Sequence, residues 1–440
     1  MRRGSSMDIR EKIMQMKAMA PNMAASSHDK RNQALSIAKQ RLLEEKEAIF
    51  LANKTDMEAA EADGATDALK KRLRFDEAKL ADVCRGIDRL IELPDPIGNI
   101  ELCRELDEGL VLKRICVPIG VLGVIFEARP DALVQIASLC IKSGNCAVLK
   151  GGSETKATNA IWFSLMEEAV VSAELPALAL VQADSHSDID ELLTLDEAVD
   201  LIIPRGSNGF VRYIMEHTSI PVMGHADGIC HMYIDKTADP GKVIPLVLDG
   251  KLQYTAACNA TETLLIDRDY PAEARDALFD ALRKANITVH GDEKLVDAFG
   301  FLPLGEDGFA HEYLEPELSV RFVDGVEEAV DHINTYGSHH TDAILSEDPD
   351  ACDYFLKMVD SAGVYQNAST RFSDGFRYGF GAEVGISTGK LHARGPVGLF
   401  GLCTYKYTLV GDGHIVGDYA SGKAAFHFRD LSLVILADNP

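Results

Sequence analysis

The sequence is poor in basic side chains. Its 440 residues include 44 lysines and arginines against 69 aspartates and glutamates, which gives a net charge of −25 at pH 7. Nucleic acids and anionic membrane surfaces attract proteins through basic faces. The charge balance therefore argues against both as general partners, but it leaves room for a small anionic ligand in a local basic pocket.

The sequence also lacks the cysteine patterns of disulfide frameworks and zinc sites. Nine cysteines stand at irregular spacings, and none forms a CxxC pair. The histidine pairs His339/His340 and His225/His231 have no partners at metal-ligand spacing, and HExxH is absent. We therefore expect no metal site, and we expect reduced thiols, which are typical of a cytoplasmic protein.

Long apolar runs are missing as well. The run Ile115–Phe126 is among the longest, but Pro118 and Gly120 interrupt it, and a membrane-spanning helix needs about 20 apolar residues. We therefore expect no membrane span. A GxGxxG dinucleotide fingerprint is also absent after the first expected strand, since the run Gly379–Gly385 has the wrong spacing.

Short apolar runs alternate with amphipathic helical patterns along most of the chain. Strands are expected at 121–126, 146–149, 179–182, 199–203 and 230–234, with helices between them. A second alternating series follows Cys258 and runs to about residue 400. Such alternation predicts α/β architecture with doubly wound parallel sheets, whose ligands bind beyond the carboxyl ends of the strands.

The regions that flank the first series have other patterns. Residues 29–92 carry apolar side chains at helical spacing, which predicts a helical layer packed on the later sheet. Residues 99–117 predict a projecting hairpin with a turn at Asp107–Gly109. The tail 407–430 alternates as strands do, and we expect it to pair with that hairpin or with another subunit.

The stretch 251–266 carries the most specific chemical signal. Small side chains at 255–257 precede Cys258, and an apolar run begins at Thr261. A thiol on a loop between ordered segments can attack a carbonyl carbon if its surroundings keep it partly ionised, so a nucleophilic Cys258 should have a lowered pKa. A lone cysteine is more often a buried structural residue, so this interpretation depends on the rest of the chain.

Two expected strand ends offer contacts for an anionic cofactor. Lys150–Glu154 follows one strand and Pro204–Ser207 follows another, each before a helix whose N-terminus favours phosphate. Glycine and serine are also ordinary turn and capping residues, so each motif alone is a weak signal.

Residues 367–406 form a long segment without a clear helix or strand pattern. Such a segment inside a compact domain is usually functional. Its basic and imidazole side chains outnumber Asp374 and Glu383, and they include Arg371, Arg377, Lys390, His392 and Arg394. This excess indicates an anion site, although a solvated loop would have a similar composition.

Together these motifs resemble the aldehyde dehydrogenase superfamily and, more closely, its γ-glutamyl phosphate reductase (glutamate-5-semialdehyde dehydrogenase) branch. The resemblance runs from about residue 7 to residue 437. Its most specific parts are Val117–Gly120, Phe126–Pro130, Lys150–Glu154, Cys258–Ala260 with Glu262 and Thr263, Asn367–Phe372 and Gly381–Pro396. It implies two doubly wound parallel-sheet domains and a small β oligomerisation flap.

The resemblance also implies domain boundaries. Residues 7–98 and 118–228 would form a cofactor-binding domain, and residues 229–403 would form a catalytic domain. Residues 99–117 and 404–440 would form the flap of a homo-oligomer.

For the chemistry, the resemblance implies NADP(H) as cofactor and Cys258 as nucleophile with Asn259 beside it. Lys150 would contact the adenosine ribose. Ser153 stands where NAD-preferring relatives often have Glu, and its small side chain leaves room for a 2′-phosphate.

The same comparison assigns the other cofactor contacts. Gly206 and Ser207 would lie near the pyrophosphate, and Glu312 would bind the nicotinamide ribose. The implied reaction is the reductive dephosphorylation of L-glutamyl 5-phosphate to L-glutamate 5-semialdehyde, a step of proline biosynthesis. A glutamate 5-kinase, which would supply this substrate, is a candidate partner.

The substrate carries a phosphate, an α-carboxylate and an α-ammonium group. We expect six side chains to bind these ends, and they are Arg129, Arg371, Ser387, Thr388, His392 and Arg394. Arginine is favoured because its guanidinium binds oxyanions in a bidentate manner.

Two departures from the superfamily bear on mechanism. No Glu stands in Gly224–Gly228, where hydrolytic members carry the base that activates water. The oxyanion Asn of the superfamily also lacks a clear counterpart, and the Cys258 N–H together with Asn259 or Arg129 are the candidates. A reductase for another acyl phosphate, acyl-CoA or semialdehyde, and a non-catalytic protein of the same fold, remain alternative hypotheses.

Overall fold

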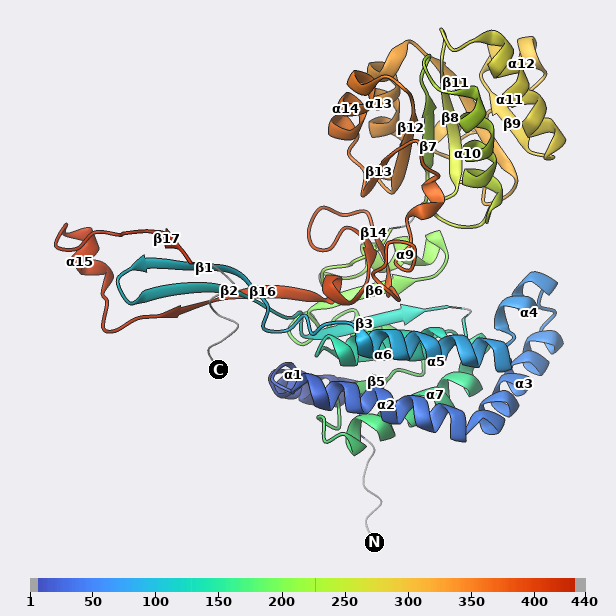
Figure 1. Ribbon diagram of the computed structural model, residues 1–440. Coiled ribbons are helices and arrows are strands. Elements are labelled where there is room, and N and C mark those ends of the chain that lie inside the picture. The colour runs from blue at the N-terminus through green and yellow to red at the C-terminus, as the bar shows by residue number, and fades with distance from the viewer. Residues whose placement is uncertain (1–6, 128, 226, 432–440) are drawn as a thin grey trace.

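The computed structural model describes residues 7–127, 129–225 and 227–431 (Figure 1). Within these ranges it contains a four-stranded parallel sheet, a seven-stranded parallel sheet, a four-stranded antiparallel sheet that projects to one side, and a two-stranded ribbon. Helices cover both parallel sheets. The predicted fold class is therefore confirmed.

A layer of helices precedes the first sheet and packs on the helices α6 and α7 of that sheet. It consists of α1 (Ile9–Ala24), α2 (His28–Glu44), α3 (Lys46–Ala62), α4 (Asp67–Leu73) and α5 (Glu77–Glu92). Four of these helices begin after a residue whose side chain accepts a backbone N–H of the first turn, and these caps are Asp8, Ser27, Thr66 and Asp76. The sequence analysis predicted the layer from residue 29 onward and missed α1, which contains Pro21.

The first sheet has the strand order β5-β4-β3-β6, and all its neighbours are parallel. Its strands are β3 (Val121–Phe126), β4 (Cys146–Gly151), β5 (Leu180–Gln182) and β6 (Leu201–Arg205), and its helices are α6 (Ala132–Lys142), α7 (Lys156–Ser172), α8 (His186–Leu192) and α9 (Asn208–Glu216). Phe126 pairs with Gly151 on one side and with Arg205 on the other. The carboxyl ends of β3, β4 and β6 therefore lie level at one edge of the sheet.

The second sheet has the strand order β10-β9-β11-β8-β7-β12-β13 and is also parallel. Its strands are β7 (Cys230–Ile234), β8 (Thr261–Asp267), β9 (Thr288–Gly291), β10 (Leu302–Pro303), β11 (Glu317–Val323), β12 (Thr341–Leu345) and β13 (Gly363–Gln366). One core lies under α10 (Pro240–Leu252), α11 (Ala272–Lys284) and α12 (Glu293–Phe299), and another lies under α13 (Gly325–Tyr336) and α14 (Pro349–Met358). Because both faces are covered, every residue of β7, β8 and β12 is buried.

The projecting sheet has the strand order β16-β2-β1-β17 and is antiparallel. It combines the predicted hairpin, β1 (Ile100–Asp107) and β2 (Leu110–Pro118), with β16 (Cys403–Val410), the short helix α15 (Val416–Ala420) and β17 (Arg429–Asp430). The prediction that the tail pairs with the hairpin is confirmed. The edge strand β16 exposes Tyr405, Tyr407, Leu409 and Val410, which is an unusually apolar surface for an edge.

One boundary drawn from the sequence does not follow the packing. The expected catalytic segment ends at residue 403, but Val384, Val397, Leu399 and Leu402 are buried in the core of the first sheet. The ribbon β14 (Gly385–Ser387) and β15 (Gly395–Val397) lies beside β6, as Figure 1 shows. The chain therefore returns to the first sheet about 20 residues earlier than expected, because the few apolar residues of this glycine-rich segment complete that core.

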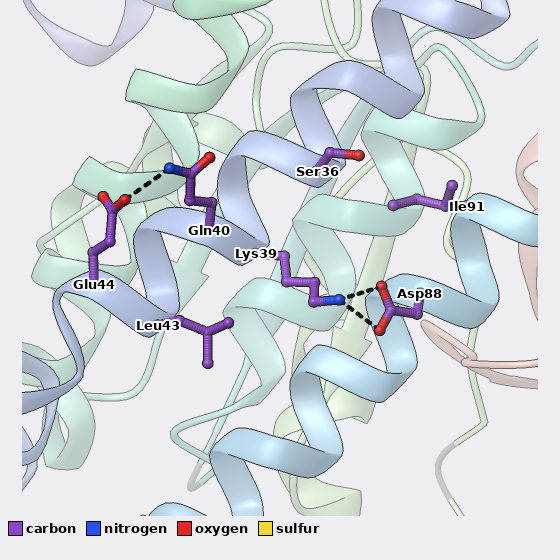
Figure 2. A pocket seen from close by; sticks show the side chains of 7 residues that line it. All are labelled: Ser36, Lys39, Gln40, Leu43, Glu44, Asp88 and Ile91. Atoms are coloured by element: carbon purple, nitrogen blue, oxygen red, sulfur yellow. Dashed lines mark hydrogen bonds and ion pairs between the residues drawn. The ribbon is translucent and has the colours of Figure 1, made fainter.

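A groove of about 430 Å³ opens on the helical layer between α2 and α5 (Figure 2). The Lys39 ammonium bridges the groove and donates to both carboxylate oxygens of Asp88, at 2.6 and 2.7 Å. None of the predicted site residues lines it. None of the described helices is long and apolar enough to cross a bilayer.

Candidate active site

Cys258 lies in the loop between α10 and β8, and its side chain is half-buried. The other eight cysteines, all within the described residues, are buried. Two backbone hydrogen bonds fold the loop into turns, from Ala257 N–H to the Tyr254 carbonyl at 3.3 Å and from Ala260 N–H to the Ala257 carbonyl at 2.8 Å. Cys258 is thus the least buried cysteine of the described chain.

The loop is tied to the segment that follows β13. Asn259 donates its Nδ2 to the Ser373 carbonyl at 2.8 Å, and Thr370 donates its hydroxyl to the Asn259 carbonyl at 2.7 Å. Both Asn259 and Thr370 are buried. This bond uses one of the two N–H groups of the amide, so the Asn259 side chain holds the loop in place, and its predicted contact with the reacting oxygen would use the other N–H.

Gly228 brings the connection between the two sheets against the backbone of Cys258. A Cβ atom built on Gly228 would overlap the Cα and carbonyl atoms of Cys258. Backbone atoms cannot give way as a flexible side chain can, so only glycine permits this contact. The site therefore lies where the carboxyl edge of the first sheet meets the amino ends of β7 and β8.

Two imidazoles lie beside the thiol. His225 comes from the loop between α9 and β7, and His340 comes directly before β12. One ring nitrogen of each, together with the Cys258 sulfur, forms a triangle with no side longer than 4.8 Å. The two rings meet edge to face with centroids 5.0 Å apart. The sequence analysis gave neither histidine a role, because residues so far apart along the chain show no spacing pattern.

Burial dominates the electrostatics of both imidazoles. It lowers the pKa of His225, against opposing effects from the Asp227 main chain and carboxylate, and it lowers the pKa of His340 well below its ordinary value. Each ring also has one buried nitrogen, Nδ1 of His225 and Nε2 of His340, that makes no hydrogen bond of good geometry to described residues. Both side chains are therefore neutral at pH 7 and can accept a proton or bind a cation.

Burial also raises the pKa of the Cys258 thiol, to about 12. The carboxylates of Glu383 and Glu312 add to this shift, and the Arg371 guanidinium opposes it. The expectation of a lowered pKa was therefore wrong for the chain without ligands. A raised pKa keeps the sulfur protonated until a base or a bound cation favours the thiolate.

Cationic side chains surround the same sulfur. Arg371 is buried, donates its Nε to Gln253 Oε1 at 2.9 Å, and lies over the Tyr254 ring. Arg205, at the end of β6, donates to the Glu383 carbonyl at 3.4 Å. Burial lowers the pKa of Arg205, and the nearby charge of Arg129 lowers it further. The structure thus brings together two predicted arginines and adds Arg205 and Glu383, which the sequence analysis did not assign.

A cleft of about 500 Å³ opens between α5, α6 and the 376–382 loop. Arg85, Arg89 and Gln135 line it, and so does Asp131, which lies two residues after Arg129. Since Arg129 affects the pKa values of Arg205 and Glu383, the cleft adjoins the cationic side of the site.

A buried ion pair links the two elements that flank the Cys258 loop. Lys251 on α10 and Glu262 on β8 are fully buried, with Nζ 2.7 Å from Oε2. The Tyr313 N–H donates to the same oxygen at 3.3 Å. Burial raises the pKa of Glu262 to about 7 and lowers that of Lys251, while each partner opposes the shift of the other. The pair connects the two elements that flank the Cys258 loop to the residue after Glu312.

The predicted cofactor residues lie at the carboxyl edge of the first sheet. Lys150 is buried at the end of β4, donates its ammonium to the Gly151 carbonyl at 2.6 Å, and has a pKa that burial lowers. Ser153 is exposed at the start of the short 3₁₀ turn Ser153–Thr155 that precedes α7. Both side chains therefore lie where a ligand at this edge could reach them.

Residues at the N-terminus of α9 contact Glu127 and Glu312. The Ser207 N–H donates to a Glu127 carboxylate oxygen at 3.1 Å, and a Cβ on Gly206 would meet the same carboxylate. Asn208 donates its Nδ2 to Glu312 Oε2 at 2.6 Å. A negatively charged group thus already lies where the pyrophosphate is predicted, which agrees with the positive end of a helix dipole.

The remaining predicted substrate residues lie on and beside the β14–β15 ribbon. Ser387 is buried, Thr388 is half-buried, and His392 is exposed. Arg394 donates to the carboxylate and the carbonyl of Asp360, each at 3.1 Å. The substrate role of Arg394 stays a prediction, and it would require this ion pair to open.

The aldehyde dehydrogenase family model matches residues 1–296. The chain belongs to the aldehyde dehydrogenase family. A γ-glutamyl phosphate reductase from Ruminiclostridium cellulolyticum is 50% identical over 426 residues, which cover 97% of this chain and 99% of the relative. This level of identity places the chain in the γ-glutamyl phosphate reductase branch of the family, as the sequence motifs suggested.

Solved structures agree with this placement. The crystal structure of γ-glutamyl phosphate reductase from Thermotoga maritima covers 93% of this chain and 100% of its own, with a TM-score of 0.90 and 33% identity. Glyceraldehyde-3-phosphate dehydrogenase from Methanocaldococcus jannaschii, solved in complex with NADP, shares the fold at 16% identity and a TM-score of 0.65, over 92% of this chain and 94% of its own.

The connection between α9 and β7 contacts the thiol. Its segment Gly224–Gly228 contains no Glu. Here that segment supplies His225 to the thiol and Gly228 to the backbone of Cys258. The space next to the sulfur is therefore taken by an imidazole and by main chain.

Replacing Gly228 by Ala should destabilise the protein, because the new methyl group must push the Cys258 loop away. Overpacking of this kind typically costs about 1–3 kcal/mol, and urea denaturation measures the loss. Gly417→Ala on α15 is the matched control, because its Cβ would meet nothing within 4 Å. Equal stability of Gly228→Ala and the unmodified protein would contradict the close contact.

Alkylation of Cys258 in the protein without ligands should speed up with pH. A thiol whose pKa is about 12 is almost wholly protonated at pH 7, and its thiolate fraction grows about tenfold for each pH unit up to that value. Iodoacetamide labelling followed by peptide mass spectrometry measures the rate between pH 7 and pH 9. A rate that is already constant across this range would show a thiol of low pKa instead.

Proposed function

We propose that this protein catalyses the NADPH-dependent reductive dephosphorylation of L-glutamyl 5-phosphate to L-glutamate 5-semialdehyde, in proline biosynthesis. The observation that carries the proposal is the half-buried Cys258 sulfur, next to two neutral imidazoles and the buried Arg371. Acyl transfer to sulfur requires these three elements, which are a reachable thiol, an acceptor for its proton and a cation for the leaving phosphate. The 50% identical relative that bears this reductase's name supports the same substrate.

The first step is ionisation of the thiol and attack on the acyl carbon. His225 and His340 are neutral, and a nitrogen of each is within 4.8 Å of the Cys258 sulfur. Burial disfavours the imidazolium form, so transfer of the thiol proton to either ring requires the groups to close to hydrogen-bond distance and the substrate's negative charge to stabilise the cation. The thiolate then forms a carbon–sulfur bond, and the bond from carbon to the phosphate oxygen breaks. Arg371 is close enough to lower the pKa of Cys258, so it can also attract the departing phosphate.

The second step is reduction of the resulting thioester. NADPH, when bound, supplies the hydride for this step. The Cys258 main-chain N–H and the Arg129 guanidinium are the candidate donors to the substrate oxygen, and one such donor is typically worth about 2.7–4 kcal/mol. Protonation of that oxygen is not needed for product release, since collapse of the thiohemiacetal frees the semialdehyde and returns the thiolate, which recovers the proton from the imidazole.

The residues at the edge of the first sheet fit a dinucleotide phosphate. Lys150 offers a buried cation at the end of β4, and Ser153 beside it is exposed and small. At α9, the Ser207 N–H already donates to the carboxylate of Glu127. Asn208, the first residue of α9, donates a hydrogen bond to Glu312. A group bound at the N-terminus of α9 would therefore lie near Ser207 and Glu312. We assign Lys150 and Ser153 to the adenosine end, Gly206 and Ser207 to the pyrophosphate, and Glu312 to the nicotinamide ribose.

The protein is also proposed to be a cytoplasmic homo-oligomer. The β16 edge exposes Tyr405, Tyr407, Leu409 and Val410 along a strand without a neighbour on its outer side in the described chain. An apolar edge of this kind is usually covered, and a second copy of the chain would supply a matching strand. All nine cysteines are free, as expected in a reducing compartment.

Replacing Cys258 by Ala should abolish the reaction in both directions. The informative assay is phosphate-dependent reduction of NADP⁺ with glutamate 5-semialdehyde, followed at the absorbance of NADPH. We expect a loss of at least 10³-fold, about 4 kcal/mol in transition-state stabilisation. Cys84→Ala, which removes a buried thiol on α5, is the control and should stay active. Retention of most turnover by Cys258→Ala would refute the nucleophile.

Replacing Ser153 by Glu should shift the cofactor preference from NADPH toward NADH. A carboxylate at this exposed position repels a 2′-phosphate, and a tenfold rise of KM for NADPH corresponds to about 1.4 kcal/mol. The ratio of kcat/KM for the two cofactors measures the change, and Ser153→Ala separates the charge from the loss of the hydroxyl. An unmodified protein that uses both cofactors equally well would overturn the assignment of NADP(H).

A further inference from the structure

The cluster of His225, Cys258 and His340 has a second capability. We propose that these three side chains form a site for a soft divalent cation of the Zn²⁺ class, and that such an ion reversibly blocks the thiol. The three residues come from three separate segments, and the fold brings them together at the junction of the two sheets. The consequence for turnover rests on the proposed function, but the binding of the ion does not.

The geometry is close to that of a three-ligand zinc site. The sulfur and one nitrogen of each imidazole lie within 4.8 Å of one another. Zn–S bonds of about 2.3 Å and Zn–N bonds of about 2.0 Å at tetrahedral angles place such ligand atoms about 3.3–3.6 Å apart. The groups therefore need to close in by on the order of 1 Å, and half-buried Cys258 leaves the fourth position to water or a small anion.

A second observation also points to a ligand. His340 is fully buried, and its Nδ1 is 2.9 Å from the Thr341 hydroxyl, which fixes the ring. Its Nε2 is buried without a hydrogen-bond partner among the described residues. A buried nitrogen that stays unpaired costs about 1–3 kcal/mol, and coordination to a metal would remove that cost at His340.

The surrounding charges both favour and oppose a cation. The carboxylates of Glu383 and Glu312 act on Cys258, and Asp227 acts on His225. Arg371 and Arg205 face the same sulfur with positive charge. Three carboxylates therefore face these two guanidinium groups and that of Arg129 beside Arg205 and Glu383, so the surrounding charges nearly balance.

The chemistry selects the ion. A thiol with two imidazoles prefers Zn²⁺, Cd²⁺ or Co²⁺ and is a poor site for Mg²⁺ or Ca²⁺, which require oxygen ligands. Binding forms a metal–sulfur bond and releases the thiol proton to solvent, so no electron is transferred. The metal withdraws electron density from the sulfur and covers it, so the bound thiolate is a weaker nucleophile toward an acyl carbon, and a chelator restores it.

The test is a titration of the full-length protein with Co²⁺ under reducing, chelator-free conditions. A thiolate ligand gives an intense thiolate-to-cobalt absorption band in the near ultraviolet, and tetrahedral coordination gives visible bands. We expect one equivalent of Co²⁺ to produce both bands, Zn²⁺ to abolish them by displacement, and Mg²⁺ to have no effect. Zn²⁺ should also protect Cys258 from iodoacetamide, as peptide mass spectrometry would show.

Variants identify the ligands. Cys258→Ser should lose the near-ultraviolet band, and His225→Gln and His340→Gln should each weaken Co²⁺ binding at least tenfold. His217→Gln removes an exposed histidine at the C-terminal end of α9 and should bind as the unmodified protein does. Should fully buried His340 fail to tolerate Gln, as judged by thermal unfolding, the half-buried His225 still tests the imidazole contribution.

Two outcomes would overturn the proposal. One is the absence of the near-ultraviolet band at millimolar Co²⁺, and the other is a band that survives in Cys258→Ser or is unchanged in His225→Gln. Failure of the proposed function is distinguishable, because the cobalt bands would then appear in a protein that shows no phosphate-dependent NADP⁺ reduction.

Discussion

The contact between Gly228 and the main chain of Cys258 is the constraint on which the site depends. Two parallel sheets meet here with opposite edges, the carboxyl ends of β3, β4 and β6 against the amino ends of β7 and β8. Because the connection between them passes directly over Cys258, it fixes the sulfur relative to the α9 N-terminus. The Cys258 sulfur on one sheet can therefore face the carboxyl edge of the other without a long loop to position it.

Burial then determines how the site behaves. The same packing that fixes the sulfur removes water from it, so the thiol keeps its proton and the imidazoles of His225 and His340 lose theirs. A neutral resting state protects the thiol from oxidation and unspecific alkylation. The buried Lys251–Glu262 pair underneath contributes a rigid base, since its two charges satisfy each other within α10 and β8.

The sequence was sufficient for the fold, and it singled out Cys258, which the structure shows to be the least buried cysteine of the described chain. Apolar runs such as 121–126 and 230–234 coincide with β3 and β7, because strands buried on both faces must be continuously apolar. The cluster around Cys258 could not be predicted from the sequence. His225 and His340 meet the thiol only through the crossing of two sheets, and Arg205 stood in a motif that was interpreted as a phosphate loop.

The sequence also gave the wrong sign for the thiol pKa. Small neighbours at 255–257 suggested an open, ionisable sulfur, whereas burial and the carboxylate of Glu383, which arrives from a distant segment, hold the proton in place. Similarly, the long polar segment 367–406 was expected to remain with the second sheet. Its buried Val384 and Leu402 return it to the first.

That return means that the chain passes between the two sheets twice, at 206–229 and again at 367–384. Two domains joined by two separate connections can rotate about the line through both connections, but they resist rotation about any other axis. The first connection carries Gly228 and the second lies between Arg371 and Glu383, so Cys258 sits close to the pivot. A rotation of one sheet relative to the other would then widen the outer rims of the junction, while the sulfur and its neighbours would hardly move.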